Sequence, residues 1–385
     1  MRKTITIGDL GTIITGKTPP TTNKNYYGDY AVFIKPTDIS EQCKFTYETE
    51  EMYSKLAAEK YESSLIPKGA ICVPCIGTIG TKMTMAPCDC YTNQSINSIV
   101  CNDRYDNEYV YYLIKNFLPG LKSYNLGTAS GREYVSKSNF EKIELVAEQD
   151  KTIQKKIGEF LSRYDSLIEN YQKQIKLLEE AAQRLYKEWF VDLHFPGHEN
   201  TKIVDGVPEG WEKKTLDDFC SVFTGKKNAN AAVLSGKYKF FTCGDTPLQI
   251  DSYIYDGPAI IISGNGSYTG RTTFYEGRFD LYQRTYACTI NNNENQDLIY
   301  GLFEIVKCEL TTQISGGTHG AAIPYIVMGD VTKFTFTSND IVLRKFSKII
   351  KSFLDRTMCI SSQIRLLTEA RDRLLPKLMS GEIEI

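Results

Sequence analysis

The sequence predicts an α+β protein in which one plan is used twice, as a pseudo-two-fold internal repeat. Two mixed α/β globular domains are each followed by a long helix, and the two helices form an antiparallel coiled coil. Three observations support this prediction: 385 residues are about twice the size of a typical single domain, short motifs recur, and two segments carry a long heptad pattern. The expected boundaries are residues 1–149 for the first domain, 150–197 for the central helix, 198–342 for the second domain and 343–385 for the C-terminal helix.

Composition limits the class of protein. Hydrophobic residues make up 42% and charged residues 24%, which is typical of a globular chain and not of a disordered one. No run of ~20 apolar residues predicts a membrane helix, and the first residues have no signal-peptide core. Eleven cysteines without a secretory signal favour reduced thiols and a cytoplasmic protein. The net charge of −2 gives no sign of nucleic-acid binding, although residues 343–385 carry nine basic and five acidic side chains.

The first domain shares short motifs with the second. TIGDLGTIITGK at 6–17 resembles TLDDFCSVFTGK at 215–226, with the same apolar spacing and the same closing Thr-Gly-Lys. GAICVPCIGTIGTK at 69–82 parallels GPAIIISGNGSYTGR at 257–271, and both predict a β-branched strand that enters a glycine-rich turn and ends in a basic residue. Gln94 then matches Gln283, at an offset of 189.

Each of the two helices carries an apolar stripe, here called the helix seam, which is unbroken in the first helix. Steps of four and three residues lead through Ile157, Leu161, Tyr164, Ile168, Tyr171, Ile175, Leu178 and Leu185, and an offset of 189 leads through Phe346, Ile350, Phe353, Ile360, Ile364, Leu367, Leu374 and Leu378. Thr357 and Arg371 break the second stripe. The first predicted helix ends near Phe190, and Pro376 falls at the end of the second, before a short SGEIEI tail. Each helix is the expected partner of the other, with the globular domains at opposite ends of a rod; the alternative is a coiled coil that only dimerises the protein.

Several motifs resemble catalytic or metal sites without their structural context. Gly11 to Thr18 matches a phosphate-binding P-loop, but Pro19 and Pro20 follow where that site requires a helix. Cys72, Cys75, Cys88 and Cys90 have irregular spacing for zinc, so buried strand cysteines are the preferred interpretation. Three histidines do not assemble into a triad or metal site, and we find no catalytic centre.

The order and duplication of these segments resemble the specificity subunit of a Type I restriction–modification system. The resemblance extends over essentially the whole chain, and includes LLEEAAQRLYKEWFVDLHFPG followed by VPEGWEKKTLDDFCSVFTGKK, and the closing LLTEARDRLLPKLMSGEIEI. It implies two target recognition domains that each read one half of a split double-stranded DNA sequence, with the helices setting the gap and docking the methyltransferase subunits.

The resemblance also implies a non-catalytic chain without a cofactor or metal of its own, in the prokaryotic cytoplasm. Two modification subunits would bring S-adenosylmethionine-dependent adenine methylation, and restriction subunits would bring an ATP- and Mg-dependent translocase and nuclease. The alternatives are a coiled-coil scaffold or ligand-binding protein, and a specificity subunit of a methylation-only system.

Candidate DNA-contact residues lie on the duplicated loops, where exposed side chains can reach base edges or phosphates. In the first domain they are Lys17, Thr18, Lys35, Thr37, Lys82, Asn93, Gln94, Arg132 and Tyr134; in the second they are Lys226, Lys227, Asn228, Asn265, Tyr268, Arg271, Gln283, Arg284 and His319. Each could instead be a solvated charge or a turn-stabilising amide. Because Gln94 and Gln283 recur in both copies, a buried structural role is the alternative for this pair.

Overall fold

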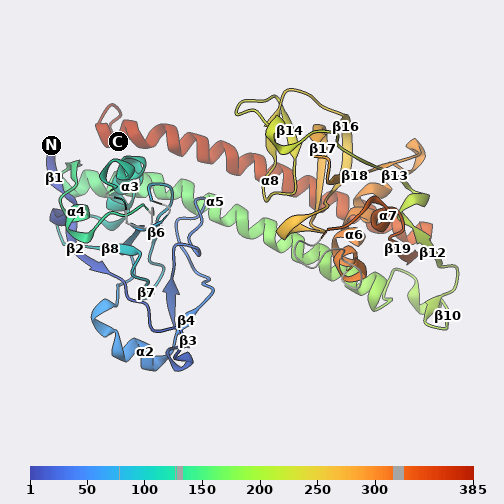
Figure 1. Cartoon of the computed structure of the whole chain (residues 1–385), viewed down its shortest axis with the longest axis horizontal. Coiled ribbons are helices and arrows are strands. Elements are labelled where there is room, and N and C mark those ends of the chain that lie inside the picture. The colour runs from blue at the N-terminus through green and yellow to red at the C-terminus, as the bar shows by residue number, and fades with distance from the viewer. Residues whose placement is uncertain (78, 126, 128–132, 315–324) are drawn as a thin grey trace. The chain divides into compact units, whose positions relative to one another are not determined.

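The computed structural model describes the chain except for residues 78, 126, 128–132 and 315–324, and it confirms the α+β class (Figure 1). Contacts divide the chain into two units, one comprising Met1–Lys173 with Ser361–Ile385 and the other Gln174–Ile360. Each unit therefore contains one globular domain together with part of each long helix. The sequence-based division instead treated the helices as separate segments.

The first unit contains three small sheets. β1 (Arg2–Thr6) pairs antiparallel with β9 (Glu144–Glu148). The second sheet has the order β2-β8-β5-β6 and the third β4-β3-β7. Their strands are β2 (Gly11–Thr15), β8 (Ile96–Cys101), β5 (Ile71–Pro74), β6 (Thr84–Met85), β4 (Met52–Tyr53), β3 (Tyr27–Ile34) and β7 (Tyr91–Thr92). The short helices are α1 (Ile7–Leu10), α2 (Lys55–Lys60), α3 (Asn107–Phe117) and α4 (Lys137–Glu141).

The core of the first unit joins its globular domain to the two long helices, α5 (Lys151–Tyr186) and α8 (Asp340–Ser380). Tyr109 and Tyr112 of α3 are almost fully buried, in one cluster with Leu161 of α5 and Leu378 of α8. Burial of each such aliphatic side chain contributes about 1.5–3 kcal/mol relative to exposure. The helix ends are therefore part of the domain core and not an appendage to it.

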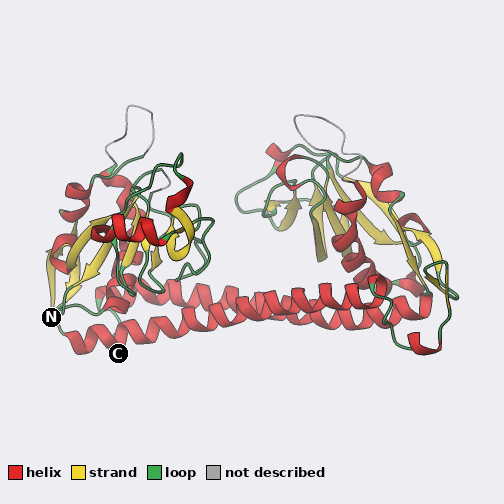
Figure 2. Cartoon of the chain, turned by 90° about the horizontal axis from the view of Figure 1, so that it is seen from below, coloured by secondary structure: helices red, strands yellow, loops and turns green. Residues whose placement is uncertain are grey.

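The second unit is built around one larger sheet, in the order β13-β18-β16-β17-β14-β15. Its strands are β13 (Cys220–Thr224), β18 (Thr285–Ile290), β16 (Tyr255–Ser263), β17 (Thr272–Leu281), β14 (Tyr238–Phe241) and β15 (Leu248–Ile250). The remaining elements are β12 (Glu212–Thr215) paired with β19 (Thr335–Ser338), the hairpin β10 (Ile203–Val204) and β11 (Val207–Pro208), α6 (Leu298–Ile314) and α7 (Met328–Thr332). α6 packs against the sheet through β16, β17 and β18 (Figure 2).

The two units repeat one local plan, as the shared motifs predict. Thr6 and Asp9 form a capping box after β1, and Thr215 and Asp218 form the same box after β12. In each case the backbone hydrogen bond from the threonine to the carboxylate lowers the pKa of the aspartate. β2, β8 and β5 of the first unit correspond in order and antiparallel pairing to β13, β18 and β16 of the second. The duplicated plan is therefore confirmed at the level of topology.

The two long helices pack antiparallel within each unit. In the first, Leu161 of α5 shares a cluster with Leu375 and Leu378 of α8; in the second, Ala182 and Tyr186 share one with Phe346 and Ile350. Each of the sixteen seam side chains named from the sequence is buried or half-buried. A π-helical turn, Lys187–Val191, follows α5 and is close to the end expected at Phe190.

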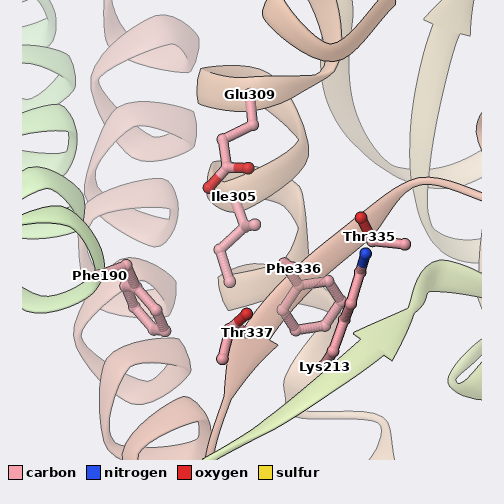
Figure 3. Close-up of a pocket in the computed structure, with 7 residues that line it drawn as sticks. All are labelled: Phe190, Lys213, Ile305, Glu309, Thr335, Phe336 and Thr337. Carbon is pink, nitrogen blue, oxygen red and sulfur yellow. The ribbon is translucent and has the colours of Figure 1, made fainter. Parts of the chain in front are cut away.

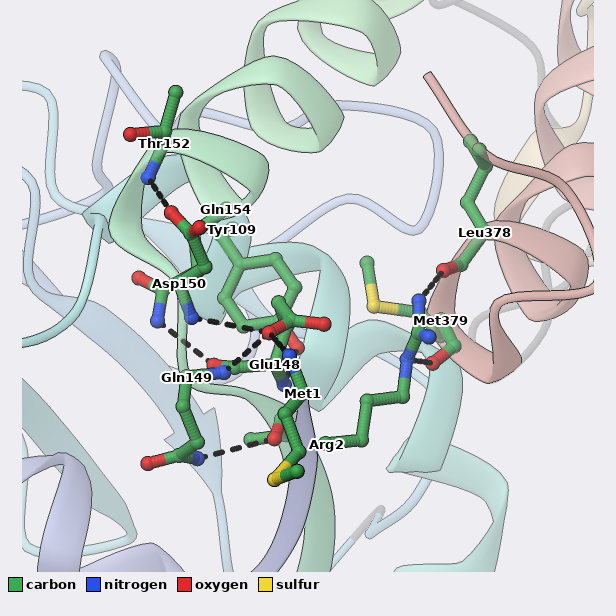
Figure 4. A network of polar contacts seen from close by, with 11 residues as sticks. Met1, Arg2, Tyr109, Glu148, Gln149, Asp150, Thr152, Gln154, Leu378 and Met379 are labelled. Carbon is green, nitrogen blue, oxygen red and sulfur yellow. Dashed lines mark hydrogen bonds and ion pairs between the residues drawn. The ribbon is translucent and has the colours of Figure 1, made fainter.

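The second helix ends where the sequence places its end. α8 continues past Pro376 to Ser380, the first residue of the SGEIEI tail. The carbonyl groups of the last turn gain an external partner, because the Arg2 guanidinium donates to the Met379 oxygen at 2.9 Å and the Leu378 oxygen at 3.0 Å (Figure 4). A side chain that satisfies the orphan carbonyls stabilises the turn beyond the proline.

Arg371 was interpreted from the sequence as a break in the seam, and the structure corrects this. Its side chain is only 5% exposed, and it pairs with Asp165 of α5, which is 4% exposed. Tyr112 also donates its hydroxyl to Asp165, at 2.5 Å. Burial by itself lowers the pKa of Arg371, but Asp165 and Asp372 outweigh it and raise that pKa. The position therefore belongs to the helix interface as an ion pair.

The P-loop-like motif and the cysteine motif lie mainly on strands and in the buried core. Gly11–Thr15 of the apparent P-loop is strand β2, and no helix begins at Gly16–Thr18. Cys72, Cys75 and Cys90 are buried, as predicted, whereas the same interpretation is wrong for Cys88, which is exposed. Among the described residues, no three His, Cys, Asp or Glu side chains are grouped as a metal site would require. Nor, in that part of the chain, is any helix long and apolar enough to cross a membrane.

Cysteine reactivity should follow this burial. All eleven cysteines lie within the described residues as free thiols, and only Cys88 and Cys359 are exposed. Burial raises the pKa of Cys72 and of Cys75 to about 12, so little nucleophilic thiolate forms at either position at pH 8 to 9. We expect iodoacetamide to alkylate Cys88 and Cys359 first in the native protein, as peptide mass spectrometry would measure. Rapid native alkylation of Cys72 would contradict this, and urea-unfolded protein provides the control.

Candidate nucleic-acid interface

In the first unit, two loops meet where β2 ends and β8 begins. The Lys17 backbone N–H donates to the Thr92 oxygen at 2.9 Å, which places the loop after β2 beside Asn93 and Gln94. The Thr18 hydroxyl donates to Gln94 Oε1. Lys17, Thr18 and Gln94 are exposed and Asn93 is half-buried. Four candidate contact residues, from segments over 70 positions apart, therefore share one edge.

The segment after β3 reaches the same edge. β3 runs parallel to β7, and the Asn93 N–H donates to the Ile34 oxygen at 3.1 Å, so the chain after Ile34 lies beside the Asn93–Gln94 loop. Thr37 is exposed. Lys35 is half-buried, and its ammonium lies 2.6 Å from a Glu50 carboxylate oxygen and 3.2 Å from a Glu51 oxygen. Burial lowers the pKa of Lys35, but these hydrogen bonds outweigh it and raise that pKa. The two carboxylates also neutralise the Lys35 charge, so its attraction for an anionic ligand is reduced.

The turn after β5 completes this edge. The Cys75 N–H donates to the Ser95 oxygen at 2.7 Å, and the Val135 N–H donates to the Cys75 oxygen at 2.8 Å. The segment that contains Tyr134 is therefore tied to the turn that leads to Lys82. Both of these side chains are half-buried. Arg132 lies outside the described residues.

The second unit brings its corresponding loops together in the same way. The Gln283 N–H donates to the Lys227 oxygen at 3.0 Å, beside the ends of β13 and β18. Lys226, Asn228, Gln283 and Arg284 are exposed. Lys227 is different: its ammonium lies 2.8 Å from the carboxylate of Asp280, which is fully buried. The Lys227 charge is thus neutralised by a buried carboxylate of the same unit.

The turn between β16 and β17 lies beside these loops. The Gly264 N–H donates to the Arg284 oxygen at 2.9 Å, which connects the turn to the Gln283–Arg284 loop. Within the turn, Asn265 is half-buried and Tyr268 is exposed. Arg271 is also exposed, and its Nη1 lies 2.5 Å from Asp245 Oδ1. His319 lies outside the described residues.

Exposure also bears on the two recurring glutamines. Gln94 and Gln283 are both exposed, so the alternative that they are buried structural amides is wrong. Their recurrence follows from the duplicated loop, which presents a side chain to solvent at the same place in both units.

Two residues at this interface were missed by the sequence analysis. Tyr325 forms an isolated antiparallel bridge with Asn265, as Tyr134 does with Ile76. The matching tyrosines, 325 − 134 = 191 positions apart, are close to the repeat offset of 189 and could have revealed this pair. Asp245, the partner of Arg271, had no such signal, because the pairing joins loops 26 residues apart.

The Thr-Gly-Lys motif has a steric reason in both units. A Cβ on Gly16 would lie 2.1 Å from the Thr92 oxygen, and one on Gly225 would lie 1.7 Å from the Leu281 oxygen. Backbone carbonyls at these positions cannot move cheaply, so any side chain would push the two loops apart. Glycine at these positions thus permits the close approach of the loops.

Replacement of Gly225 by alanine should therefore be destabilising. We expect the free energy of unfolding to fall by about 1–3 kcal/mol, because the added methyl group must displace backbone. Urea denaturation would measure the change. Gly329→Ala is the matched control in the same unit, because a Cβ there meets nothing within 4 Å. Equal stability of Gly225→Ala and wild type would contradict the steric argument.

A separate cavity of about 190 Å³ lies in the second unit (Figure 3). It is formed by α6, β12, β19 and the turn after α5, and it is lined by Phe190, Lys213, Ile305, Glu309, Thr335, Phe336 and Thr337. Tyr186 donates its hydroxyl to Glu309. None of the candidate contact residues that the structure describes lines this cavity, so it is not part of the loop edge.

Comparison with known proteins gives consistent results. Residues 2–180 and 208–355 match the family described as the Type I restriction modification DNA specificity domain. The chain is 26% identical over 406 aligned positions to the MjaIX specificity subunit of a Type I restriction enzyme from Methanocaldococcus jannaschii, covering 98% of this chain and 93% of that one. It is 38% identical over 158 residues to the HindI specificity subunit from Haemophilus influenzae, covering 39% of this chain and 33% of that one.

The fold is also similar to that of a solved structure. The crystal structure of the Type I restriction–modification S subunit from M. genitalium superimposes with a TM-score of 0.64. The alignment covers 98% of this chain and 96% of that chain, at 17% sequence identity. At this identity the similarity concerns the fold.

Proposed function

This chain belongs to the family of Type I restriction–modification specificity subunits, and on that premise we propose that each globular domain reads one half of a bipartite DNA target. The chain is the DNA-specificity subunit of a Type I restriction–modification complex, a non-catalytic component that binds no cofactor itself. Such a complex contains partner subunits and acts on DNA. In the proposal this takes place in the prokaryotic cytoplasm, on genomic DNA.

One observation carries the proposal: the same strand ends present loops with different side chains in the two units. Lys17-Thr18 of the first unit corresponds to Lys226-Lys227 of the second, and Asn93-Gln94 corresponds to Tyr282-Gln283. Side chains at base edges specify sequence, whereas the scaffold only positions them. Lysine and glutamine recur at two of these four positions, whereas Thr18 is replaced by Lys227 and Asn93 by Tyr282. Two readers that share a scaffold but differ at such positions should select different half-sites.

We assign the partners from the exposed surface of the long helices. Leu177 of α5 is 62% exposed and Leu366 of α8 is 56% exposed, and the two are 366 − 177 = 189 positions apart. The repeat therefore retains a solvent-exposed leucine on each helix. Two modification subunits, which carry the S-adenosylmethionine-dependent adenine methyltransferase, would each cover one of them. Restriction subunits with ATP- and Mg-dependent activities would join this core.

Charge substitution should test this docking surface. We expect Leu177→Lys and Leu366→Lys each to weaken binding of the modification subunit by roughly tenfold or more, since an apolar anchor would become a buried charge. Analytical ultracentrifugation of the mixed subunits would measure the stoichiometry and affinity. Leu167→Lys is the control, because Leu167 is 47% exposed on α5 but its counterpart in the repeat is Arg356. Undiminished assembly of both variants would refute the assignment.

The function itself is tested by mapping modified adenines in DNA from cells that express this chain with its modification partner. A bipartite motif with an unspecified gap is expected. Gln94→Ala and Gln283→Ala form a matched pair of variants, one for each reader, and each should relax only its own half-site. Loss of discrimination in both half-sites from either variant would count against independent readers. Absence of a methylated bipartite motif would count against the proposed readout by two domains.

A further inference from the structure

We propose that Arg271, held by Asp245 and Tyr268, reads a guanine in the half-site of the second domain. The inference rests on the proposed function and adds a base and a positioning residue to it. Its basis is an arrangement of three side chains from two loops at the edge formed by the ends of β13, β16 and β18.

The backbone of Arg271 is fixed from two sides. Its N–H donates to the Tyr268 oxygen at 2.9 Å, and its oxygen accepts from the Ser263 N–H at 3.0 Å. The side chain therefore leaves a closed turn directly before β17. An arginine on a rigid turn loses less freedom when it binds than one on a mobile loop.

The guanidinium is oriented by two further contacts. Nη1 donates to Asp245 Oδ1 at 2.5 Å, and the central carbon lies 5.2 Å from the Tyr268 ring centroid. A guanidinium carries five N–H donors in a plane, and Asp245 engages one of them. The Tyr268 ring covers one face of the guanidinium and the Asp245 carboxylate binds one edge. The plane of the guanidinium is therefore fixed before a ligand binds.

The loop that carries Asp245 is itself attached to the interface. Cys243 Sγ donates to the Arg284 oxygen at 3.2 Å, and Arg284 also accepts from the Gly264 N–H. The β14–β15 loop, the turn before β17 and the Gln283–Arg284 loop are thus joined. Asp245 is held where it can position Arg271 beside the Gln283–Arg284 loop.

Charge distinguishes a base from a phosphate as the ligand of Arg271. A carboxylate at 2.5 Å offsets the positive charge and would itself repel a phosphate. A guanine edge is neutral and presents two acceptors, O6 and N7, that match two N–H groups of an oriented guanidinium. The pair is therefore better suited to a guanine edge than to the DNA backbone.

A second triad in the same unit shows what is special about the first. Arg278 pairs with Asp256 at 2.8 Å and lies over Tyr253, but Asp256 and Arg278 are register partners across β16 and β17. Cross-strand neighbours of opposite charge are expected from sheet pairing alone. Arg271 and Asp245 are not register partners, and their pairing brings together two separate loops.

The test compares methylated motifs made by the complete modification complex with wild-type and variant chains. Arg271→Lys keeps the charge but cannot form the planar two-bond contact, so discrimination at one guanine of the second half-site should fall about 10- to 100-fold. Asp245→Ala keeps the arginine but removes the carboxylate that orients its guanidinium plane. It should relax the same base position while total DNA affinity stays equal or rises, because a negative charge is removed.

Arg344→Lys is the matched control, because Arg344 also pairs with a carboxylate, Asp297, at 3.0 Å, but on α8. It should leave the motif unchanged. An unchanged motif in Arg271→Lys, or a change in the first half-site, would overturn the inference while leaving the bipartite motif intact. A wild-type second half-site without guanine would also overturn it. Thermal unfolding of each variant distinguishes a changed contact from a damaged fold.

Discussion

Replacement of Arg371 by alanine is expected to lower the free energy of unfolding by about 3–5 kcal/mol, which is the usual cost of leaving a buried charge without its partner. Arg371 and Asp165 are 5% and 4% exposed, and the remaining partner of Asp165 would be the Tyr112 hydroxyl. The carboxylate would then have to be solvated by rearrangement of the first unit, where α3, α5 and α8 meet. Urea denaturation followed by far-UV circular dichroism would measure the loss.

Two further variants make this expectation specific. Arg356→Ala removes an exposed arginine of α8 that contacts Gln174 at 3.4 Å, and it should change stability by no more than about 0.5 kcal/mol. The double variant Asp165→Leu with Arg371→Leu replaces the pair by apolar groups and should recover most of the loss. An equally large defect in the double variant would mean that packing, and not the unpaired carboxylate, is responsible.

Removal of one heptad from each long helix is expected to change the gap of the DNA target without changing the half-site bases. Deletion of 170–176 from α5 and 357–363 from α8 retains the period of the helix seam on both helices and keeps Leu177 and Leu366. Seven residues span about 10 Å of helix, the length of about three base pairs. The original target should lose methylation, and targets with a gap shorter by about three base pairs should gain it.

A library of targets with one pair of half-sites and every gap length would measure this shift. Deletion of two residues from each helix is the control, since it rotates the apolar stripe by about 200° and should reduce stability and methylation at every gap. Retention of the original gap after the heptad deletion would refute the role of the helices in spacing. Changed half-site bases would show that the domains depend on the helices for their readout.

Local patterns were sufficient to predict the parts of the fold that depend on neighbouring residues. The Thr-Gly-Lys motifs, the strands that lead into glycine-rich turns and the heptad stripes all reflect periodicity or backbone geometry that one segment carries by itself. Arg371 was misjudged because its burial depends on Asp165, which is 206 positions away and on another helix. The contacts of Arg2 with the last turn of α8, beyond Pro376, likewise join segments far apart in the sequence and have no local signal.

In the candidate interface, too, local features could be predicted and contacts between distant segments could not. The loops that carry Lys17, Gln94 and Gln283 could be selected because they are duplicated. Whether each charge is paired could not be read from the sequence. Lys35 is paired with Glu50, which lies just before β4, and Lys227 with Asp280 of β17. Aligning the two copies of the repeat more closely could have identified Tyr325 as the counterpart of Tyr134. The ion pair between Asp245 and Arg271 could be identified only from the tertiary structure.

The capping boxes at Thr6 and Thr215 and the glycine contacts at Gly16 and Gly225 make the two domains alike in their supports and different at their tips. At the level of the gene, two similar segments therefore encode the two domains as separate modules. If each domain reads its own half-site, as proposed, a domain exchanged together with the helix residues of its core would bring its target preference with it. One half of the target would then change while the other half and the assembly stayed the same.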